Sequence, residues 1–233
     1  MALIHRWPLT ENANDVVGGL NLANNGGVTF SNYGGLFNGS SRKLTAMSSF
    51  SGSSLSICCW VKPLSHTGSG NGHCVSMDFF NDSSANKGVA IQLRDSTDGK
   101  SRACLNAVKA VSSLTYNSTY YPTNSFTYVA VTWDGTTVEL FWGNSQIASA
   151  AQSVAPSGSV CALGGFGGFD GAYTGYYDGY MIDARVYDHN LSQSEIDALV
   201  AAGPDGTYTR TRPRIPTPVI LSTMPAALTR GFR

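Results

Sequence analysis

Hydrophobic and polar residues alternate in short runs along most of the chain, and clusters of Gly, Asn, Asp and Ser separate the runs. The runs recur roughly every ten residues, which is the spacing of strands in antiparallel sandwiches rather than in units where strands and helices alternate. The pattern therefore predicts an all-β fold of two antiparallel sheets.

One run predicts a strand at the centre of a sheet. Every second residue from Leu55 to Val61 is apolar, and the intervening Cys58 and Trp60 are apolar as well. Successive side chains of a strand point to opposite faces, so this strand has two apolar faces. We expect it to be covered on both sides.

A hairpin is predicted from residue 126 to residue 142. Two β-rich runs flank Asp134 and Gly135, a pair that suits a tight turn because glycine adopts positive φ without strain. Gly143 and Asn144 form a second turn signal, which extends the hairpin into a meander. The last predicted strand runs from residue 176 to residue 187.

A single short helix is predicted after the last strand. Ser192 and Glu195 have the capping-box spacing. Gly203 and Pro204 have the order expected at a helix end. The apolar stripe between these signals consists of Ile196, Leu199 and Val200.

The composition changes after the helix, which predicts one domain over residues 1–203 and an extended arm over residues 204–233. The arm contains several prolines, which disfavour a helix or a central strand. The net charge of the chain is zero, yet no Asp or Glu follows Asp205. Five arginines do, and we predict that they dock on a partner: Arg210, Arg212, Arg214, Arg230 and Arg233. The alternative is a solvated, flexible terminus.

Four stretches together resemble the laminin-G-like jelly rolls of the concanavalin A-like lectin/glucanase superfamily. They are His5–Leu9, Leu55–Pro63, Phe126–Gly135, and Gly179–Asp188 continuing to Glu195. The resemblance spans residues 3 to 202. It implies a two-sheet antiparallel jelly-roll sandwich with one short C-terminal helix, a fold that carries lectins, adhesion modules, glycosidases and structural domains.

The residues for catalysis are sparse. Glycosidases need two carboxylates, one on each side of the scissile bond. In glucanases of the superfamily that this chain resembles, the carboxylates follow the sequence pattern Glu-x-Asp-x-x-Glu or a close variant. The three glutamates, Glu11, Glu139 and Glu195, do not form this pattern. An aspartate pair assembled by folding stays open as an alternative, but we predict a binding module rather than an enzyme.

A Gly-rich segment from residue 164 to residue 180 is the predicted ligand-binding loop. Aromatic rings stack on sugar faces and carboxylates accept hydrogen bonds from hydroxyls. The candidate ligand-binding residues are Phe169, Asp170, Tyr173, Tyr176 and Tyr177. The alternative is that these rings pack over the edge of the sandwich, as we expect for Tyr180.

The resemblance also suggests calcium, because many relatives carry this ion with oxygen ligands. Asp15 stands where relatives often have an acidic residue, and Asp170 is a second candidate ligand. Asp183 and Arg185 instead favour an internal ion pair.

Two functions fit these features. The first is a lectin-like, adhesive module that binds a glycan or protein surface and is displayed on a larger assembly through the arm. The second is a structural decoration protein of a virion or shell without a glycan ligand. We expect synthesis in the cytoplasm without a signal peptide, no membrane span and no sequence-specific nucleic-acid binding.

Overall fold

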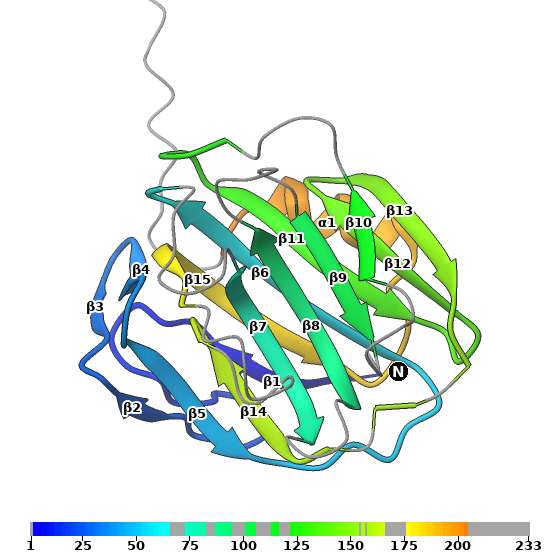
Figure 1. Cartoon of the computed structure of the whole chain (residues 1–233), viewed down its shortest axis with the longest axis horizontal. Helices are drawn as coiled ribbons and strands as arrows, with labels where there is room; N and C mark the ends of the chain where they lie inside the picture. Colours follow the sequence, from blue (N-terminus) through cyan, green and yellow to red (C-terminus); the bar gives the residue numbers. More distant parts are fainter. Residues whose placement is uncertain are drawn as a thin grey trace, which may run out of the picture.

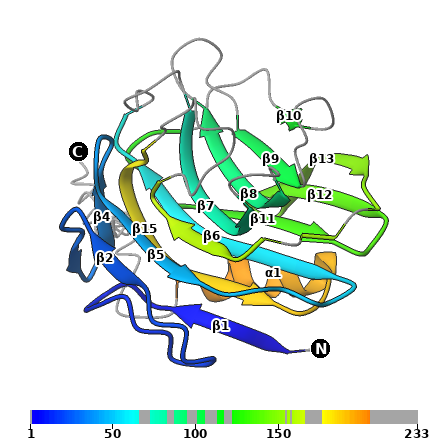
Figure 2. The ribbon, with the colours of Figure 1, turned by 60° about the horizontal axis from the view of Figure 1, so that its bottom comes forward.

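The computed structural model describes residues 2–65, 73–82, 87–94, 101–105, 113–116, 122–153, 155–156, 158–165 and 176–204. Two antiparallel sheets stack face to face, as Figures 1 and 2 show. One helix, α1 (Gln193–Ala202), lies outside them. The prediction of a two-sheet, all-β sandwich with one short helix is confirmed.

The larger sheet has eight strands. Seven follow one another in the order β13 (Ser145–Ala151), β12 (Thr137–Trp142), β11 (Thr127–Trp133), β6 (Leu55–Pro63), β15 (Asp178–Tyr187), β4 (Gly34–Asn38) and β3 (Thr29–Ser31). The eighth, β1 (Leu3–Trp7), pairs with β15. Segments from both ends of the described chain therefore lie beside the central strands.

The smaller sheet has seven strands, which face the viewer in Figure 1. Their order is β10 (Ser113–Tyr116), β9 (Ser101–Leu105), β8 (Lys87–Arg94), β7 (His73–Asp82), β14 (Val160–Leu163), β5 (Lys43–Met47) and β2 (Ala23–Asn25). All pairings in both sheets are antiparallel, as expected for a jelly roll.

The main core lies between the two sheets. Alternate residues of each strand point inward, so one face of every central strand is apolar. From β6 this face consists of Leu55, Ile57, Cys59 and Val61, all essentially inaccessible to solvent. Partners from other elements include Trp7, Phe37, Phe79, Leu93, Val129, Leu140 and Leu163.

A second core lies between the eight-stranded sheet and helix α1. It contains Cys58, Tyr128, Ala130, Phe141, Tyr187, Leu191 and Ile196. The prediction that β6 is covered on both faces is confirmed for one face and in part for the other: the second sheet covers the inner face, and α1 covers the outer face at Cys58 but leaves Trp60 partly exposed. The Cys58 and Cys59 thiols are free, and burial raises the pKa of Cys58 to about 12.

The predicted hairpin and meander are also confirmed. β11 and β12 pair from Val129 with Trp142 to Trp133 with Val138. At the turn Gly135 has φ of 99°, and the Asp134 carboxylate accepts hydrogen bonds from the backbone N–H groups of Thr136 and Thr137. Both features fix the turn locally.

Helix α1 has the predicted ends. Ser192 is the N-cap, its side chain accepts a hydrogen bond from the Glu195 backbone, and the Glu195 carboxylate accepts one from the Ser192 N–H at 2.8 Å. Gly203 ends the helix with φ of 75°, a value that glycine tolerates.

The predicted arm lies outside the described residues, so the domain boundary at residue 203 stays a prediction. In the part of the chain described, no helix is long and apolar enough to cross a membrane.

We expect Ser192→Ala to lower the free energy of unfolding by about 1 kcal/mol, because it removes the side-chain acceptor for the first turn of α1. Urea denaturation measures this change. Ser192→Thr is the matched control, since threonine retains the hydroxyl that caps the helix and that donates to the Glu195 carboxylate, and it should retain most of the wild-type stability. Equal stabilities of the alanine variant and the wild type would contradict a stabilising role of the capping box.

Candidate functional site

The predicted ligand-binding loop is described at its two ends, Gly164–Gly165 and Tyr176–Tyr180. Phe169, Asp170 and Tyr173 lie outside the described residues, so their assignment as ligand-binding residues stays a prediction. The ends meet: Gly165 and Tyr176 form an antiparallel bridge, and the Tyr177 N–H donates to the Gly164 carbonyl at 2.9 Å. The loop therefore begins and ends at one fixed point of the sandwich.

Gly164 is required at this point for two reasons. Its φ is 74°, which side chains other than glycine rarely adopt. A Cβ atom built at this position would also lie 1.9 Å from Cδ1 of Phe37, a buried ring of β4. The glycine thus lets the start of the loop approach the core closely.

Tyr177 anchors the other end of the loop. Its side chain is 1% exposed, and its ring packs edge-to-face against Phe37 with 6.0 Å between the ring centroids. Its hydroxyl donates a hydrogen bond to the Tyr180 carbonyl. Because a buried ring cannot stack on a sugar, the prediction that Tyr177 contacts a ligand is corrected: this tyrosine holds the loop on the core.

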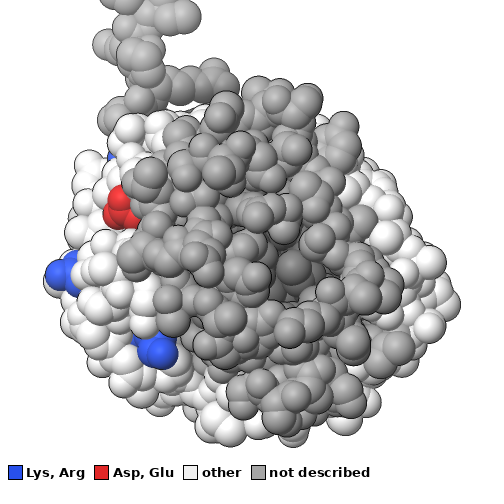
Figure 3. Space-filling view, in the orientation of Figure 1, with Lys and Arg blue, Asp and Glu red and all other residues white. Residues whose placement is uncertain are grey.

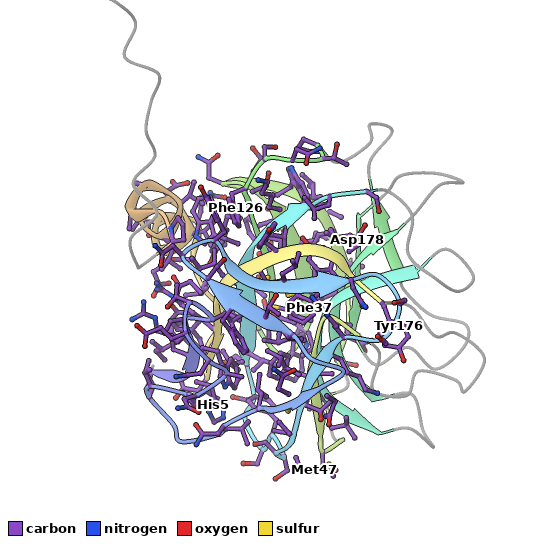
Figure 4. The ribbon with its side chains drawn as sticks, turned by 90° about the vertical axis from the view of Figure 1, so that its left-hand side faces the viewer. His5, Phe37, Met47, Phe126, Tyr176 and Asp178 are labelled. Atoms are coloured by element: carbon purple, nitrogen blue, oxygen red, sulfur yellow. The ribbon has the colours of Figure 1, made fainter. Side chains whose placement is uncertain are left out.

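Tyr176 and Asp178 are the described candidates at the edge of the sandwich. Both are partly exposed, and Figure 4 shows both on the side away from helix α1. The Asp178 carboxylate accepts a hydrogen bond from the Ser65 hydroxyl at 2.7 Å. We call Tyr176, Asp178 and Ser65 the rim. Tyrosine, carboxylate and hydroxyl side chains supply the ring and the hydrogen-bonding groups that a sugar needs.

The rim is braced by a neighbouring turn. The Asn38 side-chain oxygen accepts backbone hydrogen bonds from Ser40, Ser41 and Arg42, and the Gly39 N–H donates to the Tyr177 carbonyl. These bonds give the backbone N–H groups of the turn their hydrogen-bond acceptors. The described part of the rim is therefore held in place by hydrogen bonds.

Asp15 does not fit calcium, and this prediction is corrected. Its carboxylate is inaccessible to solvent and lies 2.7 Å from Nδ1 of His5. The carboxylate also accepts hydrogen bonds from four backbone N–H groups. The backbone donors are Arg6, Val17, Gly18 and Leu20. Calcium requires a shell of oxygen ligands, whereas this carboxylate is surrounded by nitrogen donors. It organises the loop that follows β1.

These donors also change the acidity of Asp15. Burial acts to raise the pKa of the carboxyl, but the hydrogen bonds from the backbone and from His5 outweigh it and lower the pKa below its usual value. The ionised form is therefore the one that the fold stabilises.

The predicted Asp183–Arg185 ion pair is present. Asp183 is 2% exposed in its side chain and binds both Arg185 and Arg6, the latter at 2.9 Å. Burial acts to lower the pKa of Arg185, but the hydrogen bond and charge of Asp183 raise it overall. Asp183 has φ of 56° at a β-bulge of β15, so the bulge turns the carboxylate towards arginines of two strands.

No group of three or more His, Cys, Asp or Glu side chains suited to a metal ion occurs among the residues that the structure describes. The second calcium candidate, Asp170, lies outside them. On the face drawn in Figure 3, the described charged side chains lie near one edge.

A group of side chains that sequence reasoning missed lies on the outer face of the eight-stranded sheet. Tyr33, Lys62, Phe126 and Tyr180 come together there, and we call them the aromatic–lysine strip. The Lys62 ammonium lies 5.9, 6.0 and 5.7 Å from the ring centroids of Tyr33, Phe126 and Tyr180, respectively. The spacing of aromatic residues gives no hint of this cluster, because it depends on which strands are neighbours.

The fold is that of a lectin-like β-sandwich. The sequence matches the model of the concanavalin A-like lectin/glucanases superfamily over residues 37–197, which is more than half of the chain, and the protein belongs to this superfamily. No curated protein matches the chain.

Several solved structures share the fold. Domain 4 of AbnA, a GH43 extracellular arabinanase from Geobacillus stearothermophilus in complex with arabinotriose, has a TM-score of 0.60 and 17% identity, and the match covers 85% of this chain and 98% of that one. The SAP-like pentraxin from Limulus polyphemus has a TM-score of 0.51 and 15% identity, with 70% and 77% covered.

The botulinum neurotoxin serotype D ligand-binding domain, solved with N-acetylneuraminic acid, has a TM-score of 0.61 and 16% identity. That match covers 86% of this chain and 50% of the toxin domain. At these identities the comparisons show a common fold.

We expect Asp15→Asn to lower the free energy of unfolding by about 2 kcal/mol at neutral pH, because an amide nitrogen replaces an acceptor oxygen among buried donors. The lowered pKa also sets the pH dependence. The stabilisation by ionised Asp15 is present above the pKa of the unfolded chain, near 4, and is lost as the pH falls through the folded value.

Urea denaturation at neutral and acidic pH tests both statements. The difference between wild type and Asp15→Asn should shrink in acid. Asp197→Asn, which changes an exposed carboxylate of α1, is the control and should leave the acid response of the wild type unchanged. A difference independent of pH would contradict the role of the ionised carboxylate.

Proposed function

We propose that this protein is a carbohydrate-binding module that binds a glycan at the rim without cleaving it. The observation that carries the proposal is the closed base of the Gly-rich loop, where the Gly165–Tyr176 bridge places an aromatic ring and the Asp178 carboxylate at one edge of a lectin-like sandwich. Phe169, Asp170 and Tyr173 belong to the same loop and extend the proposed site.

Two of the similar structures support a sugar as the ligand class. The AbnA domain was solved with arabinotriose and the serotype D toxin domain with N-acetylneuraminic acid. The two sugars differ in charge and in size, so they favour carbohydrate in general rather than one glycan.

The glutamates favour binding over cleavage. Glu195 caps helix α1, and Glu139 lies on β12 beside the Thr132 hydroxyl. A retaining or inverting glycosidase needs a second carboxylate within about 5–10 Å of the first, across the sugar. The sequence contains only one further glutamate, Glu11, so a catalytic pair would have to include aspartates, which stays the alternative.

A glycan array with the full chain, with and without calcium, tests the proposal. We expect binding to at least one glycan class, and Tyr176→Ala to weaken it about tenfold, as for an aromatic side chain at the centre of a contact. Tyr176→Phe retains the ring and is the matched control. The absence of any bound glycan under both conditions, or hydrolysis of the bound glycan, would overturn the proposal.

We further propose that the basic arm beyond α1 attaches this module to a larger assembly, such as a virion or particle surface, where it acts in adhesion. The support is the charge distribution: five arginines and no carboxylate side chain follow Asp205. Such a segment suits an acidic partner surface and orders on binding. The alternative is a purely structural decoration protein without a glycan ligand.

Truncation after Gly206 tests the attachment. We expect the shortened chain to retain its fold and its glycan binding but to lose most of its occupancy on the native assembly. Replacement of Arg210, Arg212, Arg214, Arg230 and Arg233 by glutamine keeps the length of the arm and isolates the contribution of charge. Full occupancy of the truncated chain would exclude docking through the arm.

A further inference from the structure

The outer face of the eight-stranded sheet is divided into two parts. Helix α1 covers one part, where Cys58 of β6 and Tyr128 of β11 are buried. Further along β6, on the same face, Trp60 and Lys62 are only partly buried. Side chains that alternate along a strand share a face, so the aromatic–lysine strip begins where the cover of the helix ends.

The register of the strands assembles the strip. Tyr180 of β15 lies directly opposite Lys62 of β6, and Tyr128 of β11 lies opposite Trp60. Phe126 precedes β11 and therefore reaches the level of Lys62 from the other side. Tyr33, in the turn between β3 and β4, completes the group. In Figure 4, Phe126 lies in the upper part of the view, whereas His5 and Met47 lie in the lower part.

Lys62 has an unusual environment for a lysine. Its ammonium lies within about 6 Å of three ring centroids, a cation–π distance. No carboxylate lies within ion-pair distance of it in the described part of the chain. Asp178, two residues before Tyr180, is hydrogen-bonded to Ser65 instead. The strip thus contains a cation without an anionic partner from the described residues.

The rings leave a surface on which a ligand can lie. Tyr33 is 54% exposed, although large aromatic side chains are usually covered. Its ring centroid lies 6.1 Å from that of Tyr180, and the planes are inclined by 59°. Two inclined rings beside an ammonium group offer an apolar face and a charged donor at the same place.

We propose that the aromatic–lysine strip is a second binding site of this protein, for a sugar that bears a carboxylate. The rings contact the C–H face of the sugar, and the Lys62 ammonium donates a charge-assisted hydrogen bond to the carboxylate. A neutral sugar would use the rings but would leave the cation without a counter-charge. The proposal rests on the proposed carbohydrate-binding function but places a distinct site on the outer face.

The test uses the full chain with two acidic probes, sialyllactose and an oligogalacturonate, each beside the same sugar with its carboxylate reduced to an alcohol. We expect the wild type to bind at least one acidic probe about tenfold more tightly than its reduced form, the effect of one charge-assisted hydrogen bond. Higher ionic strength should reduce this preference, since salt screens exposed charges.

Variants locate the site. Lys62→Gln should abolish the preference for the acidic sugar, and Lys62→Arg should retain most of it. Tyr33→Ala should weaken the binding of the acidic and the reduced sugar alike, whereas Tyr33→Phe should retain both. Circular dichroism and thermal unfolding check that each variant is folded.

Three outcomes would overturn the proposal: no binding of either acidic probe, an unchanged preference in Lys62→Gln, or a preference that Tyr176→Ala removes and Lys62→Gln does not. The last result would assign acidic sugars to the rim. Glycan binding confined to neutral sugars would leave the proposed function intact and exclude only the second site.

Discussion

The covering of the apolar residues on both faces of β6 is the constraint on which the rest of this structure depends. One face lies against the seven-stranded sheet and forms the main core, and part of the other lies beneath α1. Burial of apolar area contributes about 25 cal/mol per Å², so a strand with two apolar faces is stable only where both are covered. This requirement brings β11 and β15 to its two edges and holds the C-terminal helix on the outside of the sandwich.

The same constraint decides where ligands can bind. Helix α1 covers only part of the outer face, so Lys62 and its neighbouring rings lie at the border between a core and the solvent. Among the described residues, the side chains on the inner faces of the sheets pack into the main core, so the edges and the outer faces are the surfaces open to a ligand there. The rim and the aromatic–lysine strip both occupy such positions, and both are held by strands whose other face belongs to the main core.

Several polar groups that resemble functional residues instead build this scaffold. Asp15 gathers backbone N–H groups around one buried carboxylate, and Asp183 joins arginines of β1 and β15. Tyr177 fastens the Gly-rich loop to Phe37. Buried charges and hydroxyls are costly unless they are paired, so the hydrogen-bond partners of these residues indicate a structural role rather than a binding role.

The sequence by itself determined the features that arise from neighbours in the chain: the alternation of β6, the turn at Asp134 and Gly135, and the capping box of α1. Each depends on interactions over a few residues, which the sequence displays directly. Tertiary structure decided the rest. Tyr176 and Tyr177 are adjacent, and only the contact with Phe37 selects the one that is buried. The four residues of the aromatic–lysine strip are far apart in the chain, and they meet because strand register places side chains from different segments on one face.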